Sequence, residues 1–295
     1  MELSTLKIFK TVAEAGSVSK AAQALHYVQP NVTMRVKQLE EELEVKLFHR
    51  KPKGMALTPA GEILRRYTEA MLKLESEAKQ ALAETGELRG ALKLGSMVST
   101  AAVRLPRVMA SFHRRHPQVE INLRTENSEG LIRRVLGYEL DAAFVAGPVN
   151  HPDIEKQPAF KETLVLVSPK NRRPLKDRPQ NTVLVFPPGC AYRARLDAWL
   201  RAKGMIPYKA MELGTLEGIL GCVIAGMGVT LLPQSVVMKN GLIEKVDVHA
   251  IEARYAATTT LFIRRKDAFA RKAISELLEV IALEQSGQTG PQSKE

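Results

Sequence analysis

The sequence of 295 residues contains only two cysteines, Cys190 and Cys222. Two thiols are too few for a disulfide scaffold or for a zinc site made of four thiolates. The histidines form no zinc-binding pattern, and His113 and His116 stand beside two arginines that would repel a cation. We therefore expect no metal and no cofactor.

Long apolar runs are also missing. No stretch of about 18 apolar residues occurs, and the first ten residues have neither the positive lead nor the apolar core of a signal peptide. Hydrophobic residues make up 45% and charged residues 25%, the balance of a globular protein. These features predict a cytoplasmic protein that does not bind membranes and is long enough for two or three domains.

The common motifs of enzymes are absent. The sequence has no G-x-G-x-x-G, no G-K-[ST], no G-x-S-x-G and no H-E-x-x-H. An enzyme is therefore not expected. The formal net charge of +11 suits a nucleic acid partner, but only a small part of this excess falls in the first 90 residues. Charge alone does not locate a DNA-binding site.

Three short helices are predicted at the N-terminus. Apolar residues from Leu3 to Glu14 recur at three- and four-residue spacing, which is typical of an amphipathic helix. A second helix is expected from Val18 to Leu25, with Ser17 as its N-cap. Pro30 suits the first turn of a third helix, which continues through residues 31–42.

The third helix has an apolar face, with Val32, Val36 and Leu39, and a polar face suited to base edges and phosphates. This pattern predicts a helix-turn-helix, in which the last helix enters the major groove. A helical bundle with a solvated polar face is the alternative. The DNA-contacting candidates are Ser17, Gln29, Pro30, Asn31, Thr33, Met34, Arg35 and Lys37.

A basic segment follows the third helix. Residues 45–61 contain four cations and no acid, with Pro52 and Gly54 as turn residues. This composition predicts a two-stranded wing whose tip contacts phosphates and completes a DNA-binding domain over residues 1–58. To the candidates we add Arg50, Lys51 and Lys53.

Further residues form a pattern along the same segment: Leu6, Phe9, Val12, Ala13, Glu14, Gly16, Ser17, Ala21, Ala22, Leu25, Gln29, Pro30, Val32, Val36, Lys37, Leu39, Glu40, Glu44, Leu47, Phe48, Arg50, Leu57, Thr58, Ala60 and Gly61. This pattern resembles the LysR-type transcriptional regulators, and the resemblance covers nearly the whole chain apart from its last ten or so residues. It implies an effector-responsive, sequence-specific regulator that forms a homotetramer from two dimers.

The sequence departs from the family's pattern in the turn His26-Tyr27-Val28 and at Asn31 and Met34. These positions face DNA in the expected complex. The departures therefore concern which operator sequence is bound, and not whether DNA is bound.

A long linker helix is expected over residues 59–87. Apart from Gly61, no proline or glycine follows Pro59 until Gly86, and an apolar stripe runs from Ile63 to Leu82. At ~1.5 Å per residue such a helix is about 40 Å long. A stripe of this length favours a coiled coil with a second copy of the chain, and the resulting homodimer predicts an inverted-repeat operator on double-stranded DNA.

Beyond residue 90 the sequence alternates between strands and helices, which predicts an α/β unit with a largely parallel sheet. The expected strands are 91–96, 119–124, 142–145, 163–167, 182–186, 229–231 and 258–264, and the expected helices are 100–116, 128–137, 193–203, 216–225 and 268–283.

The expected fold is α plus α/β: a winged helix-turn-helix, a linker helix and a two-lobed effector domain that resembles periplasmic binding proteins. Lobe I would comprise residues 91–161 with 266–285, and lobe II residues 162–265. Residues 286–295 are expected to be a disordered tail.

Folds of this kind bind ligands outside the carboxyl ends of their strands, here between the lobes. The loop after the first strand offers hydroxyls and helix N-terminal N–H groups to an anion, so a small carboxylate is the expected effector. Ser99 and Thr100 are equally consistent with simple N-caps, and Phe144 with the core. The effector-binding candidates are Ser96, Met97, Ser99, Thr100, Thr125, Asn127, Ser128, Phe144, Gly189, Cys190 and Thr215.

Three functional hypotheses follow. The first is a DNA-binding transcriptional regulator whose C-terminal domain binds a small effector, with RNA polymerase as a candidate partner. The second is a solute-binding protein, for which residues 91–285 alone would suffice. The third is a redox-sensing regulator, because a helix N-terminus at Cys190 lowers a thiol pKa.

Overall fold

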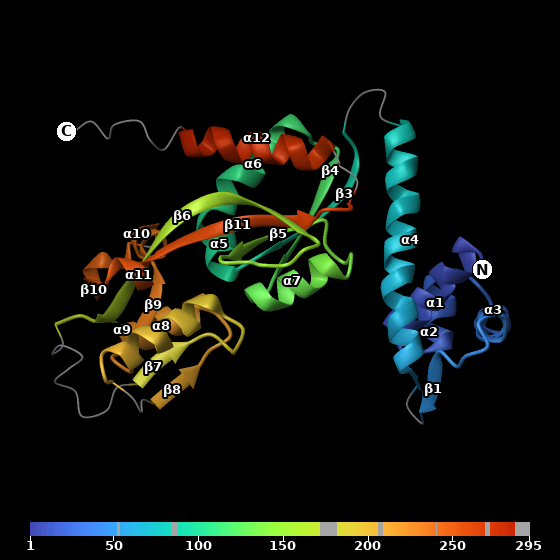
Figure 1. The fold of residues 1–295 in the computed structure, drawn as a ribbon, viewed down its shortest axis with the longest axis horizontal. Coiled ribbons are helices and arrows are strands. Elements are labelled where there is room, and N and C mark those ends of the chain that lie inside the picture. Colours follow the sequence, from blue (N-terminus) through green and yellow to red (C-terminus); the bar gives the residue numbers. More distant parts are fainter. Residues whose placement is uncertain are drawn as a thin grey trace. The chain divides into compact units, whose positions relative to one another are not determined.

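A computed structural model describes residues 1–51, 54–83, 88–171, 182–205, 209–239, 241–268 and 272–286 (Figure 1). The chain folds as two compact units, the first built mainly from residues 1–86 and the second mainly from the residues that follow. Within the described ranges, no helix is both long enough and apolar enough to cross a membrane.

The first unit begins with three helices, α1 (Leu3–Ala15), α2 (Val18–Ala24) and α3 (Gln29–Glu42). Their apolar faces meet in a core that includes Phe9, which is fully buried. Gly16 ends α1 because it adopts a φ of +60°, which favours glycine. The three predicted N-terminal helices are confirmed, with ends that differ by one or two residues.

Two short strands, β1 (Phe48–Lys51) and β2 (Gly54–Leu57), pair antiparallel after α3. The Met55 N–H donates to the Gly16 carbonyl at 2.8 Å, so the hairpin lies against the end of α1. A Cβ on Gly54 would come within 2.3 Å of that carbonyl oxygen, which explains the glycine. The predicted two-stranded wing is confirmed for these residues.

Helix α4 (Pro59–Ala83) follows the hairpin and packs on α1. The Thr58 hydroxyl accepts a hydrogen bond from Gly61 N–H at 3.0 Å and donates to the Lys46 carbonyl at 2.7 Å, and so starts the helix. Lys7 and Glu75 form an ion pair between α1 and α4. The expected helix is present, and residues 84–87 lie outside the described part.

The second unit contains a seven-stranded sheet in the order β10-β6-β11-β5-β3-β4, with β9 also paired to β6, and a separate β7-β8 pair. Its strands are β3 (Gly90–Ser96), β4 (Val119–Thr125), β5 (Ala142–Ala146), β6 (Ile154–Pro169), β7 (Thr182–Val185), β8 (Lys209–Glu212), β9 (Thr230–Pro233), β10 (Val246–Ala250) and β11 (Ala257–Arg265).

The helices of the second unit cover these sheets (Figure 1). They are α5 (Val98–Val103), α6 (Leu105–Arg115), α7 (Ser128–Leu136), α8 (Ala191–Ala202), α9 (Leu216–Ile224), α10 (Gln234–Lys239), the 3₁₀ helix η2 (Leu242–Glu244), α11 (Ala253–Ala256) and α12 (Lys272–Ser286). We call β3–β5 with α5, α6, α7 and α12 lobe I, and β7–β10 with α8–α10 lobe II. The long strands β6 and β11 run through both lobes.

Two sequence expectations for this unit were wrong. The main sheet is mixed. Strand β6 pairs antiparallel with β9, β10 and β11, and β11 also pairs antiparallel with β5, whereas β3 pairs parallel with β4 and β5. The single helix expected over residues 100–116 is two helices. Pro106 lacks the N–H that would continue α5, and it occupies the first turn of α6 instead.

Candidate functional site

The polar face of α3 is exposed. Val32, Val36 and Leu39 are buried in the core of the first unit. On the other side, Gln29, Pro30, Thr33, Met34 and Lys37 are exposed, and Asn31 and Arg35 are half-buried. The outward face of α3 is therefore available to a partner.

Several side chains on this face already have partners. The Ser19 hydroxyl donates to Gln29 Oε1 at 3.0 Å, and the Thr33 hydroxyl donates to the Gln29 carbonyl at 3.0 Å. Arg35 Nη1 lies 3.7 Å from a Glu2 carboxylate oxygen, which directs it toward α1. Ser17 caps α2 by accepting a hydrogen bond from Lys20 N–H at 3.5 Å.

Glu40 joins α3 to the base of the wing. Its Oε1 accepts hydrogen bonds from the N–H groups of Leu47 and Phe48 at 2.8 and 3.2 Å, and Lys46 Nζ donates to Oε2 at 2.9 Å. Burial opposes ionisation of Glu40, but the hydrogen bonds from Lys46 and the two N–H groups outweigh it and lower the pKa. The ionised carboxylate thus fixes β1 relative to α3.

The basic candidates of the wing are only partly described. Arg50 and Lys51 belong to β1, opposite Met55 and Gly54, with side chains outside the described part of the structure. Lys53 lies outside the described residues.

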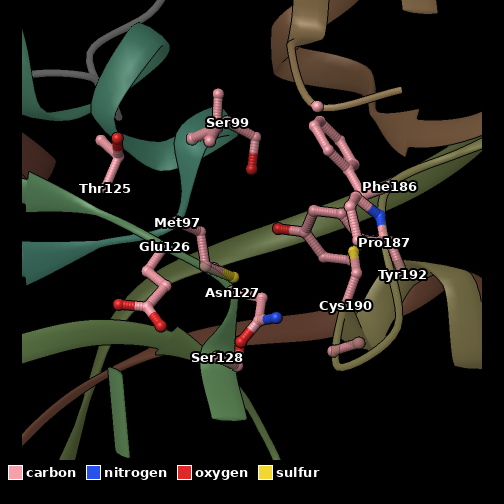
Figure 2. Close-up of a pocket in the computed structure, with 13 residues that line it drawn as sticks. Met97, Ser99, Thr125, Glu126, Asn127, Ser128, Phe186, Pro187, Cys190 and Tyr192 are labelled. Carbon is pink, nitrogen blue, oxygen red and sulfur yellow. The ribbon is translucent and has the colours of Figure 1, made fainter. Parts of the chain in front are cut away.

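A cavity of about 230 Å³ lies in the second unit, between the lobes. It is bounded by the turns that follow β3 and β4 in lobe I and those that follow β7 and β8 in lobe II. Figure 2 shows the two groups of side chains facing each other. The lining residues are Met97, Val98, Ser99, Thr125, Glu126, Asn127, Ser128, Phe186, Pro187, Cys190, Ala191, Tyr192 and Gly214.

Six of the effector-binding candidates line this cavity: Met97, Ser99, Thr125, Asn127, Ser128 and Cys190. The other five are not among the lining residues. Ser96 and Thr100 are buried, and Phe144 stacks on Phe160 and meets Phe262 edge-on in the core of lobe I. Gly189 lies in the turn beside the cavity, and Thr215 caps α9 by accepting a hydrogen bond from Gly218 N–H at 3.1 Å.

Two hydrogen bonds cross the cavity between the lobes. The Tyr192 hydroxyl shares a hydrogen bond with Ser99, and Figure 2 shows that hydroxyl pointing toward lobe I. Asn127 Nδ2 donates to the Pro188 carbonyl at 3.0 Å. Gly189 permits the second contact, because it has a φ of +88° and a Cβ there would lie 2.8 Å from Asn127 Nδ2. Both bonds hold the lobes near each other at the cavity wall.

The cavity has an unusual charge environment. None of the thirteen lining residues is a lysine, arginine or histidine, and Glu126 is their single ionisable carboxylate. A hydrogen bond from Arg134 at 2.6 Å lowers the pKa of Glu126 against the opposing effect of burial, and Arg124 lies 3.5 Å away. The charge of Glu126 is therefore neutralised by arginines outside the lining.

Helix N-termini surround the same cavity. Helices α5, α7 and α8 begin at Val98, Ser128 and Ala191, which all line it, and α9 begins two residues after Gly214. The N-terminus of a helix carries a partial positive charge and unpaired N–H groups. Four such ends therefore bring helix N-terminal N–H groups to the wall of one cavity.

Arg104 and Glu162 form a largely buried ion pair at the end of α5. Arg104 Nε donates to Glu162 Oε1 at 2.7 Å, and the Glu162 carboxylate also accepts from the Ser235 hydroxyl at 2.9 Å. Glu162 is 8% exposed. Arg104, the residue after α5, thus ties the end of that helix to β6, which carries Glu162.

Burial governs the chemistry of Cys190. Burial raises the pKa of its thiol, and the hydrogen bonds from the N–H groups of Arg193 and Tyr192 only partly oppose this. The thiol is accordingly protonated at neutral pH, whereas a reactive sensor cysteine is a thiolate.

A Cys222→Ser variant, in which Cys190 is the remaining cysteine, is expected to react slowly with iodoacetamide at pH 7. Its rate should rise with pH and reach half its maximum above pH 9, since the folded pKa is raised. Alkylation reactions quenched at successive times and analysed by mass spectrometry measure this rate. A plateau already reached at pH 7 would restore the redox-sensing hypothesis.

A winged helix-turn-helix unit joined to a two-lobed domain with a cavity between its lobes defines a class, the DNA-binding regulators that carry a ligand-binding domain. Residues 3–62 match the family model for the bacterial regulatory helix-turn-helix protein of the lysR family, and residues 85–285 match that for the LysR substrate binding domain. The chain belongs to the LysR family of transcriptional regulators.

Known relatives cover nearly the full length of the chain. The HTH-type transcriptional regulator GltR of Bacillus subtilis (strain 168) is 42% identical over 281 residues, which are 94% of this chain and 95% of the relative. Full-length OxyR from Pseudomonas aeruginosa has a similar fold, with a TM-score of 0.76 at 24% identity over 100% and 99% of the two chains. So does CbnR in complex with its target DNA, with a TM-score of 0.69 at 22% identity over 96% and 99%.

Family membership decides between two of the sequence-based hypotheses. The chain is a transcriptional regulator with a helix-turn-helix DNA-binding domain and a substrate-binding domain, and not a solute-binding protein. The related proteins are regulators and not enzymes, in agreement with the missing catalytic motifs.

Proposed function

We propose that this regulator binds an inverted-repeat operator in the cytoplasm through the outward face of α3, with the wing against the phosphates. The observation that carries the proposal is the exposure of Gln29, Thr33 and Lys37 beside a fully buried opposite face. Side chains of this kind hydrogen-bond to base edges and phosphates in the major groove. CbnR, which has a similar fold, was solved in complex with its target DNA, and this supports the proposal that the present chain binds DNA.

Two copies of the chain pair through α4. Ile63, Tyr67 and Leu74 are 50%, 60% and 56% exposed, and their spacing of four and seven residues puts them on one side of the helix. An apolar stripe of this length on a helix favours a partner helix with the same stripe. Such a dimer presents two copies of α3, and two dimers form the tetramer that the family resemblance implies. RNA polymerase is the further partner expected at a promoter.

The effector is a small anion, most simply a carboxylate, bound in the cavity between the lobes. The four helix N-termini supply its positive environment, and the hydroxyls of Ser99, Thr125 and Tyr192 supply hydrogen bonds. Binding there alters the contacts between the lobes, because Ser99 and Tyr192 already bridge them. A ligand that favours one arrangement of the lobes shifts the population of DNA-binding states.

A Gln29→Ala variant tests the DNA-binding face. It should bind its selected operator more weakly than the parent chain by ~1–3 kcal/mol, the usual contribution of a base contact, and remain a dimer. Fluorescence anisotropy with a duplex chosen from a random library by the parent chain measures the loss. An equal loss on random-sequence DNA would exclude base recognition by Gln29.

A further inference from the structure

The centre of the outward face of α3 is apolar. Met34 stands two residues from both Val32 and Val36, which are buried, so a helix of 3.6 residues per turn places it on the opposite side. Met34 is 51% exposed. Pro30, one turn earlier on the same side, is also exposed.

Val28 is a second exposed apolar side chain, immediately before the first turn of α3. It is the N-cap of α3, it provides no side-chain hydrogen bond to the helix, and it is 69% exposed. Valine is a poor N-cap residue, because it cannot accept a hydrogen bond from the first-turn N–H groups. Val28 thus stabilises neither the helix end nor the core. Residues that break a local rule of stability in this way are expected at functional positions.

An apolar surface at this position has a specific counterpart in the major groove. Among the base-pair edges exposed there, the 5-methyl group of thymine is the apolar one, and the remaining groups are hydrogen-bond donors and acceptors. Gln29, Thr33 and Lys37 flank the apolar surface with polar groups. The face therefore combines an apolar centre with polar neighbours.

We propose that Val28 and Met34 are specificity-determining residues that contact thymine 5-methyl groups in each operator half-site. The inference rests on the proposed function, in which α3 enters the major groove. Beyond that function, it specifies which group of the base the two side chains recognise, namely the thymine methyl.

Replacing thymine by deoxyuridine tests the proposal, because it removes the methyl group and leaves every hydrogen-bonding group in place. A duplex selected by the full-length chain from a random library is remade with deoxyuridine at one thymine at a time. At each contacted thymine we expect affinity to fall about fourfold, as the loss of one buried methyl group predicts. Fluorescence anisotropy measures each dissociation constant.

Protein variants link each methyl group to a side chain. Met34→Ala should bind the unmodified duplex more weakly and lose its sensitivity to deoxyuridine at one thymine, and Val28→Ala should do the same at another. Met238→Ala, which truncates a 57% exposed methionine of lobe II, is the matched control and should keep full sensitivity. A thermal melt checks that the Met34 and Val28 variants remain folded.

The possible failures are distinguishable. If the chain selects no sequence, the proposed DNA-binding function fails. If it selects an operator but tolerates deoxyuridine at every position, the methyl contact is excluded while DNA binding stands. If Met34→Ala and Val28→Ala keep the full pattern of deoxyuridine sensitivity, other residues contact the methyl groups and the assignment is wrong.

Discussion

A chain carrying Ile63→Lys and Leu74→Lys together is expected to be monomeric. It should bind its operator at least ~100-fold more weakly, because a monomer loses the gain in affinity that comes from linking two DNA-binding domains. Both side chains are at least half exposed in the single chain. Burying each contributes ~1.5–3 kcal/mol, and a symmetric dimer loses each contribution twice. Sedimentation velocity measures the oligomeric state, and anisotropy with the selected duplex measures DNA binding.

A Ser76→Lys variant is the control for this experiment. Ser76 is exposed on α4, but its position thirteen residues after Ile63 puts it on a different side of the helix. This variant adds a positive charge and should remain a dimer with unchanged operator affinity. A double Ile63 and Leu74 variant that still sediments as a dimer would show that α4 does not form the interface.

The second large effect is expected from Thr125→Asp, which places a carboxylate in the cavity wall. Thr125 is exposed at the end of β4 and lines the cavity. A carboxylate about 4 Å from a bound anion raises the free energy of the complex by ~4 kcal/mol at the effective dielectric constant typical of a protein surface. We expect at least ~100-fold weaker binding of any carboxylate that stabilises the parent chain, measured by thermal shift with acetate, benzoate and succinate.

Thr125→Asn provides the matched neutral control. Asparagine has nearly the same size as aspartate but carries no charge, so the ligand-induced thermal shift should persist. Loss of the shift in both variants would indicate a steric effect instead. Retention of the shift in the Asp variant would exclude an anionic effector at this position, and a parent chain that responds to none of the acids would remove the carboxylate proposal.

The sequence predicted the first unit closely because its signals are local. Gly16 marks the end of α1, Ser17 caps α2, and Pro30 lies in the first turn of α3. The periodic apolar residues of α3 also identified its buried face correctly. Each of these features depends on residues only a few positions apart.

The second unit was predicted less well because its strands depend on distant partners. Strand β6 is sixteen residues long, but only residues 163–167 were expected, since its first half does not alternate between buried and exposed positions. Strands β8 and β10 were missed because they are short and largely exposed. Pro106 was a visible signal for the break between α5 and α6.

The cavity was predicted in outline and not in detail. The turns after the strands were expected to meet, and six of the candidate side chains line the cavity. Glu126, Phe186 and Tyr192 were not among the candidates. Their orientation toward the cavity follows from how the lobes pack, and no spacing rule gives it. Tyr192 precedes the buried Leu196 and Trp199 on α8, which makes it resemble an ordinary core residue.

Hydroxyl-radical footprinting of the selected duplex with the full-length chain tests the central claim most directly. The account predicts two protected half-sites related by a dyad, with protection that weakens as salt rises and disappears in the Ile63 and Leu74 double variant. A single protected site without a dyad, or no localised protection at any salt concentration, would contradict it.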